Sequence, residues 1–594
     1  MEPPPHMIEY LLGPAMPYVP DHEMPGDRSP ISPEEDWDLS FNNPKNRVDS
    51  SSLDEQESGW RLFRVDLVRR RLSAAPTFAL GHSLRRIDIH LSAGIDLDNP
   101  AWRDQRPTLT KIVHMDGGCR DSLLGRHVVR ALGYWSRSMD DFTQRYMELP
   151  FGSKIVIKTL KQDAEQSEIF FDAASSIESQ WASVETLREA WDMPGGPWPP
   201  SIDISDLGLI SELHESITLV SASGILPQNR YVLKSSISQP KYLYQEVKQL
   251  LSMEGHQNVM SKPLALVTKK VQFGNKRGVC GMLLPYYPEG TLAQALRPGS
   301  KVGSRADLET KFRWAYQTAS ALNHIQSSPV RYYSDLKLDN ILLVDRNGRH
   351  DVVIIDFEQR GAWFSWSPPE INRIAHVVYL AESGGGWIPP PIRDKFRDIC
   401  RAHLPAWQAP YQQRRPRYID SELGYNVCWK TLSAVERERA TSFMFGRVLW
   451  SIFEGQTSPN AAEFLGAEVF RETDHRHRFP ATRQTPPEIG ELIRRCTSGA
   501  PEWEGEVRCI ERDGDAVYSR GRDIRGGGSA EDASSALRDW WLRYQMKAEE
   551  FVKRRSVGEE SDDFVKAMKR PSMAEILKVL AQFGGKHGLL ESVS

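Results

Sequence analysis

Two short segments near the middle of the chain place acidic, basic and amide side chains close together. The first reads Tyr-Ser-Asp-Leu-Lys-Leu-Asp-Asn and carries Asp335, Lys337 and Asn340. The second, Val352–Phe357, is a β-branched run followed by Asp356 and a phenylalanine. A carboxylate can accept a proton from a hydroxyl group, and carboxylate oxygens are ligands that a hard cation such as Mg²⁺ prefers. Either segment alone is weak evidence, because such residues are common in loops and at strand ends.

In this order and spacing, the two segments resemble the catalytic loop and the metal-binding Asp-Phe-Gly motif of serine/threonine protein kinases. The resemblance implies that Asp335 accepts the proton of the attacking hydroxyl and that Lys337 steadies the γ-phosphate. It also implies that Asn340 and Asp356 hold magnesium on the phosphates. ATP and Mg²⁺ are the expected cofactors. The expected reaction transfers the ATP γ-phosphate to serine or threonine hydroxyls of a protein substrate.

An earlier stretch resembles the nucleotide-binding lobe of the same family. Lys234 ends the predicted strand Arg-Tyr-Val-Leu-Lys and resembles the ATP lysine, whose expected partner is Glu246 on the next helix. A His-Gln-Asn-Val turn after that helix favours Glu246 over Glu254 as this partner. The stretch 283–292 resembles the hinge between the lobes. The other expected adenine contacts are an apolar pair above and below the ring and backbone groups at its edge: Val232, Leu342, Tyr286 and Tyr287.

Several features depart from the family's pattern. The run Glu212–Ser216 contains no glycine, although glycines in this first hairpin normally let backbone amides approach the phosphates. Tyr333 and Ser334 replace the usual His-Arg before the catalytic aspartate, and Glu358 replaces the glycine of Asp-Phe-Gly. Thr441 replaces an aspartate that normally braces the catalytic loop. The chemistry expected at the phosphates therefore rests on the side chains that remain.

Three interpretations of the function stay open. A protein kinase is favoured, because the lysine, the glutamate, the catalytic aspartate, the asparagine and the metal-binding aspartate are all present. A pseudokinase would bind nucleotide and act as a scaffold or interaction module. A kinase of a small-molecule substrate is the third interpretation, because an insertion interrupts the region where peptides dock in the family.

Two further motifs predict how the second lobe is held together. Glu370 ends a Ser-Pro-Pro-Glu run that resembles the family's Ala-Pro-Glu motif, and Arg570 lies in an Arg-Pro motif near the end of the chain. The resemblance implies a buried ion pair between Glu370 and Arg570. The activation segment, Phe357–Pro369, is short, and Ser334 replaces the arginine that would receive a phosphate. We therefore expect activity without phosphorylation of this segment.

The elements that would position these residues follow an α+β pattern. Short strand patterns and one helix over 200–292 predict a small strand-rich lobe, and helical periodicity over 293–594 predicts a larger helical lobe. Together they predict a bilobal, protein-kinase-like fold. Insertions at about 384–436 and 499–563 interrupt the second lobe.

The first third of the chain carries no recognisable catalytic constellation. Residues 1–58 are rich in proline and acidic residues and are predicted to be a disordered tail. Over 59–193, the alternating run Lys154–Lys158 predicts a strand, and apolar residues at helical spacing from Ile177 to Trp191 predict an amphipathic helix. We therefore expect a mixed α/β domain of unknown role there. Protein partners are expected at this domain and at the two insertions.

The composition is that of a multidomain globular protein. Of 594 residues, 40% are hydrophobic and 26% charged, and the formal charge is -4, which predicts neither nucleic acid nor an anionic membrane as a partner. No run approaches about 20 apolar residues, so no membrane-spanning helix is expected. Six scattered cysteines without a paired motif favour a reducing compartment, which makes the cytoplasm, or the nucleus, the expected location.

Overall fold

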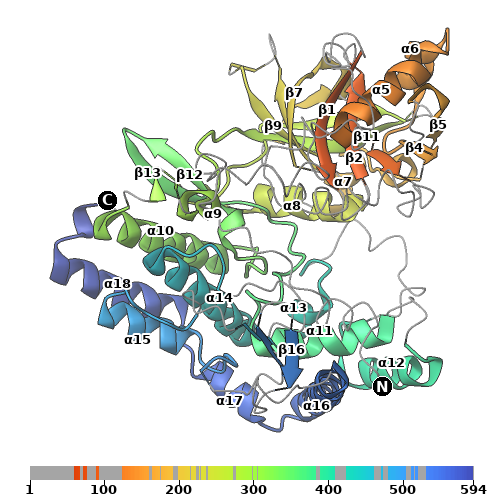
Figure 1. The fold of residues 1–594 in the computed structure, drawn as a ribbon. Coiled ribbons are helices and arrows are strands. Elements are labelled where there is room, and N and C mark those ends of the chain that lie inside the picture. Colours follow the sequence, from red (N-terminus) through yellow and green to blue (C-terminus); the bar gives the residue numbers. More distant parts are fainter. Residues whose placement is uncertain are drawn as a thin grey trace, which may run out of the picture. The chain divides into compact units, whose positions relative to one another are not determined.

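A computed structural model describes the chain from Gly59 onward, with gaps. The described residues are 59–66, 71–76, 88–91, 123–159, 164–173, 176–191, 198–214, 216–222, 226–227, 229–235, 239–271, 276–297, 299–300, 302–303, 306–382, 388–407, 423–459, 470–472, 479–503, 510–513, 516–519 and 530–592. The predicted tail over 1–58 lies outside them. Helices and strands are both abundant, so the predicted α+β class is confirmed (Figure 1).

The chain divides into two compact units, which are described one at a time. The sheet unit comprises Glu23–Val247 and Lys262–Tyr286, and the helical unit comprises Met1–His22, Lys248–Ser261 and Tyr287–Ser594. The segment expected to form a separate N-terminal domain and most of the segment expected to form the small lobe are therefore grouped in one unit. No helix in the described ranges combines the length and apolarity that a bilayer crossing requires.

The sheet unit begins with a five-stranded sheet. Its strands lie side by side in chain order: β1 (Trp60–Asp66), β2 (Arg71–Pro76), β3 (Asp88–Leu91), β4 (Lys154–Thr159) and β5 (Glu168–Asp172). Strands β3 and β4 pair in parallel, and the other neighbours pair antiparallel. The helices α5 (Leu123–Arg137) and α6 (Phe142–Glu148) pack with this sheet through aromatic side chains such as Trp60 and Phe142, whose ring centroids are 5.7 Å apart. The strand predicted at Lys154–Lys158 is confirmed as β4.

A six-stranded sheet forms the rest of the sheet unit. Its strands are β6 (Ser201–Asp203), β7 (Gly208–His214), β8 (Ile217–Ser221), β9 (Tyr231–Ser235), β10 (Ala265–Lys270) and β11 (Arg277–Pro285), in the spatial order β6-β10-β11-β9-β8-β7. The helix α8 (Pro240–Ser252) follows β9. The short strands and the helix predicted over 200–292 are thus present in the structure.

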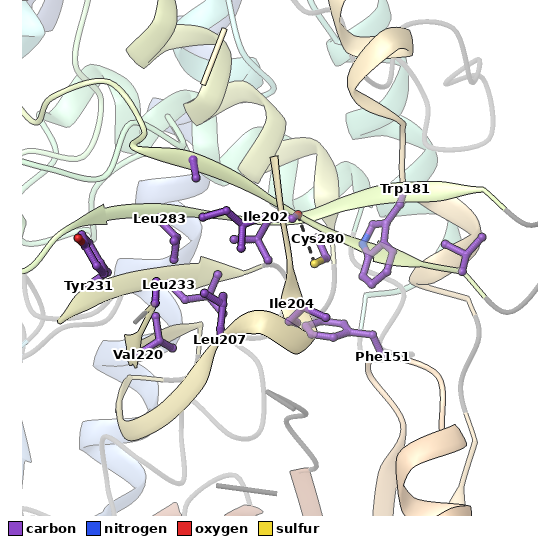
Figure 2. Packing of buried hydrophobic residues seen from close by; sticks show 14 of the residues in the cluster. Phe151, Trp181, Ile202, Ile204, Leu207, Val220, Tyr231, Leu233, Cys280 and Leu283 are labelled. Atoms are coloured by element: carbon purple, nitrogen blue, oxygen red, sulfur yellow. Dashed lines mark hydrogen bonds between the residues drawn. The ribbon is translucent and has the colours of Figure 1, made fainter. Parts of the chain in front are cut away.

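The helix predicted from Ile177 to Trp191 is only half correct. Helix α7 spans Val184–Trp191, whereas the 3₁₀ turn η5 spans Glu178–Gln180, and Trp181 is extended with φ -70° and ψ 137°. Trp181 instead packs, with Phe151, against buried residues of the six-stranded sheet (Figure 2). Ile177 belongs to the same buried cluster. The apolar spacing therefore arose from two separate packing surfaces, which happened to fall at helical intervals.

The helical unit contains ten helices and five strands among the described residues. They are α9 (Leu292–Leu296), α10 (Leu308–Ser327), β12 (Ile341–Arg346), β13 (Arg349–Ile354), α11 (Pro369–Glu382), α12 (Pro390–His403), α13 (Val427–Thr431), α14 (Ala434–Glu454), β14 (Phe470–Glu472), α15 (Pro487–Cys496), β15 (Ile510–Asp513), β16 (Ala516–Ser519), α16 (Ala530–Ser556), α17 (Asp562–Met568) and α18 (Met573–His587). Helix α10 packs against α14 and α18 (Figure 1).

Capping residues explain where the central helices begin and end. Helix α10 starts after Asp307, whose carboxylate accepts a hydrogen bond from the Thr310 amide. Helix α14 starts at a capping box between Ser433 and Glu436 and stops at Gly455, which has φ 68°. Most side chains of α14 are buried, so this helix forms the core of the unit.

Both predicted insertions contain ordered elements. Helices α12 and α13 lie in the first insertion, and α16 lies in the second, where it packs against α11 and α12. Strands β15 and β16 also lie in the second insertion, whereas 408–422 and 520–529 lie outside the described residues.

Candidate functional site

The residues expected to do chemistry in the helical unit are gathered by the hairpin of β12 and β13. The two strands pair antiparallel from Ile341 and Ile354 to a tight turn at Asn347-Gly348, where φ is 57° and 79°. Asparagine and glycine are the residues that adopt such left-handed turn angles most readily. The Ile355 amide also donates to the Asn340 carbonyl at 3.0 Å. The hairpin therefore brings the end of the first segment beside the start of the second.

Asp335 is surrounded by the other two candidates of its own segment. Lys337 Nζ lies 3.1 Å from Oδ1 and 3.0 Å from Oδ2 of Asp335. Asn340 Nδ2 donates to the Asp335 carbonyl oxygen at 2.8 Å, which fixes the orientation of the amide and leaves its Oδ1 as the acceptor. The spacing Asp-x-Lys-x-x-Asn therefore corresponds to a real cluster.

The electrostatics of Asp335 suit a group that exchanges a proton near neutral pH. Its side chain is buried, and this burial raises the pKa of Asp335 to about 7. Lys337 opposes the rise in pKa, whereas the nearby Asp356 carboxylate adds to it. General bases act most efficiently when their pKa lies near the working pH. Asp335 meets that condition in this environment.

Asp356 follows β13 in an unusual backbone conformation. Its φ is 65°, which lies in the left-handed region that non-glycine residues seldom adopt. The next residue, Phe357, is fully buried, and its ring centroid lies 5.3 Å from that of Tyr333. Tyr333 Oη donates to the carbonyl of Ile355, the residue before Asp356. Tyr333, noted in the sequence only as a departure, thus links the two segments.

Gln359 is a site residue that the sequence analysis missed. Its buried side chain accepts a hydrogen bond from the Ser334 amide at 2.9 Å and donates one to the Tyr332 carbonyl at 2.6 Å. One amide thereby brackets the backbone immediately before Asp335. No sequence signal marks this role, because a single glutamine after Asp-Phe-Glu looks the same in the sequence as a glutamine exposed on the surface. Thr441, where a bracing aspartate was expected, donates instead to Arg437 of its own helix.

The sheet unit holds the predicted lysine and glutamate as a pair. Lys234 on β9 lies with its Nζ 2.6 Å from Oε2 of Glu246 on α8, and the two side chains are 7% and 1% exposed. The choice of Glu246 over Glu254 is therefore confirmed as a contact. Val232, two residues before Lys234, is half-buried, as is Tyr286 at the end of β11.

The remaining adenine candidates belong to the helical unit. Leu342 on β12 is half-buried between two fully buried neighbours and bridges to Thr291. Tyr287 is half-buried, and burial raises the pKa of its hydroxyl, with Arg346 opposing the rise. The predicted residues thus form two groups, each held within one unit.

Two departures from the expected pattern are visible in the backbone and in an ion pair. Strands β7 and β8 pair up to His214 and Ile217, so the connection where a glycine-rich loop was expected is very short. Glu215, within it, lies outside the described residues. Glu358 forms an ion pair with Arg360, with Oε2 and Nε 2.5 Å apart.

The predicted ion pair between Glu370 and Arg570 is confirmed. The Arg570 guanidinium donates to both carboxylate oxygens, at 2.5 and 3.0 Å, and its Nε donates to the Ser498 carbonyl at 2.9 Å. It also lies 4.7 Å from the ring centroid of Phe443. Both side chains are almost completely buried, so the pair belongs to the core of the helical unit.

No protein-family model matches the chain, and no curated protein is significantly similar to it.

Proposed function

We propose that the chain is a protein-kinase-like phosphotransferase, which transfers the γ-phosphate of ATP to serine or threonine hydroxyls of a protein substrate. The observation that carries the proposal is the cluster around Asp335. It combines a buried carboxylate whose pKa is raised to about 7, a lysine on both its oxygens, and an asparagine tied to its carbonyl. A base, a cation for a phosphate and an amide for a metal are the parts that phosphoryl transfer requires.

In this proposal Asp335 orients the substrate hydroxyl and takes its proton. Lys337 then binds a γ-phosphate oxygen. To do so, its ammonium group would give up part of its contact with Asp335. Asn340 and Asp356 supply oxygen ligands, the donor set that Mg²⁺ prefers, so these residues fit the ion. Mg²⁺ when bound neutralises charge on the phosphates. Tyr333 and Gln359 position the two segments through their backbone hydrogen bonds.

Lys234 and Glu246 are assigned to nucleotide binding. The carboxylate of Glu246 holds the Lys234 ammonium in one place, which is the preorganisation that a phosphate contact needs. The half-buried Val232 and Leu342 are assigned to the adenine faces, and the backbone near Tyr286 and Tyr287 to its edge. In this proposal the six-stranded sheet with α8 is the small lobe and the helical unit is the large lobe.

A nucleotide-binding pseudokinase is the second candidate function. The observation that favours it is the short, glycine-free connection between β7 and β8, because glycine amides normally approach the phosphates there. Glu358 in place of a glycine after Asp356-Phe357 adds a negative charge near the proposed metal ligand. A pseudokinase would bind Mg-ATP and never transfer its phosphate.

Transfer of radiolabelled phosphate from ATP tests the proposal. The purified chain is incubated with Mg-ATP and a peptide library with central serine or threonine, and Asp335→Asn serves as the control. Wild type should label peptides, and the control should label them about 10²–10⁴-fold more slowly. Binding without any transfer would support the pseudokinase instead. Labelling of small metabolites but of no peptide would contradict the protein substrate.

The cytoplasm is the proposed site of this reaction. The cysteines Cys280, Cys400, Cys428 and Cys496 are free and buried in the structure, which agrees with a reducing compartment.

A further inference from the structure

Polar contacts attach the segment Ile177–Ala182 to the six-stranded sheet. The 3₁₀ turn η5 presents Glu178, whose carboxylate accepts a hydrogen bond from the Phe151 amide at 2.7 Å and forms an ion pair with Lys269 on β10. Lys276 Nζ donates to the Trp181 carbonyl at 3.1 Å. The segment is therefore fixed to β10 by the mostly buried pair of Glu178 and Lys269, and to the residue before β11 by the exposed Lys276.

Packing holds the same segment as tightly as these polar contacts do. Phe151 and Trp181 lie beside Ile204 and Cys280 in the core of the sheet, with the two aromatic ring centroids 5.2 Å apart (Figure 2). A Cβ atom at Gly278 would come within 2.6 Å of the Trp181 side chain. Only glycine allows this close approach of β11 to the segment Ile177–Ala182. The glycine at position 278 therefore permits the two backbones to lie this near each other.

A single tyrosine hydroxyl joins this segment to helix α8. Tyr244 is fully buried, and its Oη donates to the Val279 carbonyl at 2.9 Å while it accepts from the Ala182 amide at 2.9 Å. The Val279 amide in turn donates to the Ala182 carbonyl at 2.8 Å. The hydroxyl therefore closes a ring of hydrogen bonds that involves α8, β11 and the segment Ile177–Ala182.

We infer that Tyr244 is a positioning residue, through which the segment Ile177–Ala182 sets the orientation of α8 and hence of Glu246. Tyr244 precedes Glu246 by two residues on the same helix, and the Glu246 carboxylate must meet Lys234 within 2.6 Å. A rotation of α8 would stretch that contact. The inference rests on the proposed role of Lys234 in nucleotide binding. It gives residues 151–182 a function inside the nucleotide-binding half rather than in an independent module.

The test compares Tyr244→Phe with Ser221→Ala in the full-length chain. The first removes only the hydroxyl, and the second removes another side-chain hydrogen bond of the same sheet, from Ser221 Oγ on β8 to the Gly208 carbonyl on β7. Loss of one or two buried hydrogen bonds from α8 should raise the Kd for Mg-ATP about threefold to tenfold in Tyr244→Phe. Hydrogen exchange of the α8 amides should also rise. Ser221→Ala should change neither quantity.

Two readouts separate the failure of this inference from that of the proposed function. Unchanged Mg-ATP affinity together with unchanged α8 exchange in Tyr244→Phe would overturn the inference. If wild type does not bind Mg-ATP, the proposed function fails, and faster α8 exchange in Tyr244→Phe alone would still support the coupling. If Tyr244→Phe does not fold, Lys269→Met releases the ion pair of Glu178 and must raise α8 exchange, or the inference is wrong.

Discussion

In the proposed function, Asp335 and Asp356 are two carboxylates of one cluster to which different tasks are assigned. Asp335 is buried against Lys337, with a pKa raised to about 7, whereas Asp356 lies at the end of β13 with a left-handed backbone. Environments that differ in this way separate an acid–base role from a metal-binding role. The identity of the residue does not decide its task, since both are aspartates.

The first prediction separates these two tasks by mutation. Asp335→Asn should keep nearly wild-type Mg-ATP affinity and lose phosphoryl transfer by about 10²–10⁴-fold, because a proton acceptor is removed. Asp356→Asn should weaken both Mg-ATP binding and transfer, and Lys234→Met should also weaken both. Calorimetry measures the affinities, and radiolabel measures transfer. Wild-type transfer by Asp335→Asn would show that the catalytic assignment is wrong.

A second prediction concerns Gln359. Gln359→Met keeps the side-chain volume but leaves the buried Ser334 amide and Tyr332 carbonyl without this partner, at a cost of about 1–3 kcal/mol for each group. The catalytic loop should lose its position, so kcat should fall at least tenfold while Mg-ATP affinity stays close to wild type. Thermal unfolding and steady-state kinetics measure the two effects.

The control for this prediction is a second glutamine with a similar pattern of contacts. Gln317 on α10 is buried, accepts from the Val352 amide at 3.0 Å and donates to Asp351 at 2.8 Å. Gln317→Met should lower the melting temperature to a similar extent and leave kcat nearly unchanged. Equal losses of kcat in both variants would reduce the role of Gln359 to stability alone.

At the scale of elements, the stretch Phe357–Pro369, which was expected to be the activation segment, is held in place by hydrogen bonds. Asn372 on α11 donates to the carbonyls of Phe364 and Ser367, at 3.2 and 3.3 Å. Ser367 Oγ donates to the Ala362 carbonyl, and both Ser365 and Ser367 are buried. The two hydroxyls are therefore used or enclosed by the fold rather than offered to another enzyme.

The third prediction follows from this arrangement. Phosphatase treatment should leave transfer activity within about twofold of the untreated enzyme, and Ser367→Ala should do the same, because no arginine precedes Asp335 to receive a phosphate. Peptide labelling before and after treatment measures this. Activity that disappears with phosphatase and returns on rephosphorylation of Ser365 or Ser367 would contradict it.

The fourth prediction concerns the ion pair that joins α11 to the turn between α17 and α18. Arg570→Ala leaves the buried Glu370 carboxylate without its partner, which costs about 3–5 kcal/mol of unfolding free energy. Glu370→Ala should destabilise the protein similarly. Arg494→Ala is the matched control, because its pair with Glu491 is more than half exposed and contributes at most about 1 kcal/mol. Equal melting of Arg570→Ala and wild type would show that the pair adds no stability.

At the scale of the whole molecule, local sequence signals predicted the helices and strands better than the long-range contacts between them. The helix α10 and the turn at Asn347-Gly348 were predictable, because capping, periodicity and turn chemistry are written within a few residues. Gln359 was not, because its role depends on backbone atoms about 25 residues earlier. Trp181 was placed on the wrong element for the same reason: its partners lie on β11, far along the chain.

The same limit applies to the candidate site. The types and spacing of Asp335, Lys337, Asn340 and Asp356 were readable in the sequence, and so was the pairing of Lys234 with Glu246. The bracing of the loop was not readable, since the structure uses Tyr333 and Gln359 where the family pattern suggested other residues. Catalytic groups need particular chemistry, whereas bracing needs only a donor or acceptor that reaches the backbone.

The last prediction concerns how the folded molecule responds to acid. His376 on α11 is buried between Trp541 and Tyr544 of α16, with ring centroids 5.0 Å away in each case. Among the described residues, neither ring nitrogen has a hydrogen-bond partner. Burial, together with a smaller contribution from the nearby Arg373, lowers the pKa of His376 from 6.5 to about 3. The folded protein therefore resists taking up a proton that the unfolded chain accepts.

The sign of the effect follows from this difference in proton uptake. Above pH 6.5 His376 is neutral in both the folded and the unfolded state, so it does not affect the folding free energy. Below pH 6.5 the unfolded chain binds a proton at His376 before the folded protein does. The stability of the folded protein therefore falls as the pH drops toward 3. At pH 5 the loss is about 2 kcal/mol, at 1.36 kcal/mol per pH unit.

His376→Phe keeps an aromatic ring between Trp541 and Tyr544 but cannot be protonated. Its melting temperature should exceed that of wild type, by a margin that grows as the pH is lowered from 7.5 to 5. Subtracting the two curves removes the contributions of all other titrating groups, including Asp335. A constant difference between wild type and His376→Phe over this range would show that His376 is protonated equally in the folded and unfolded states.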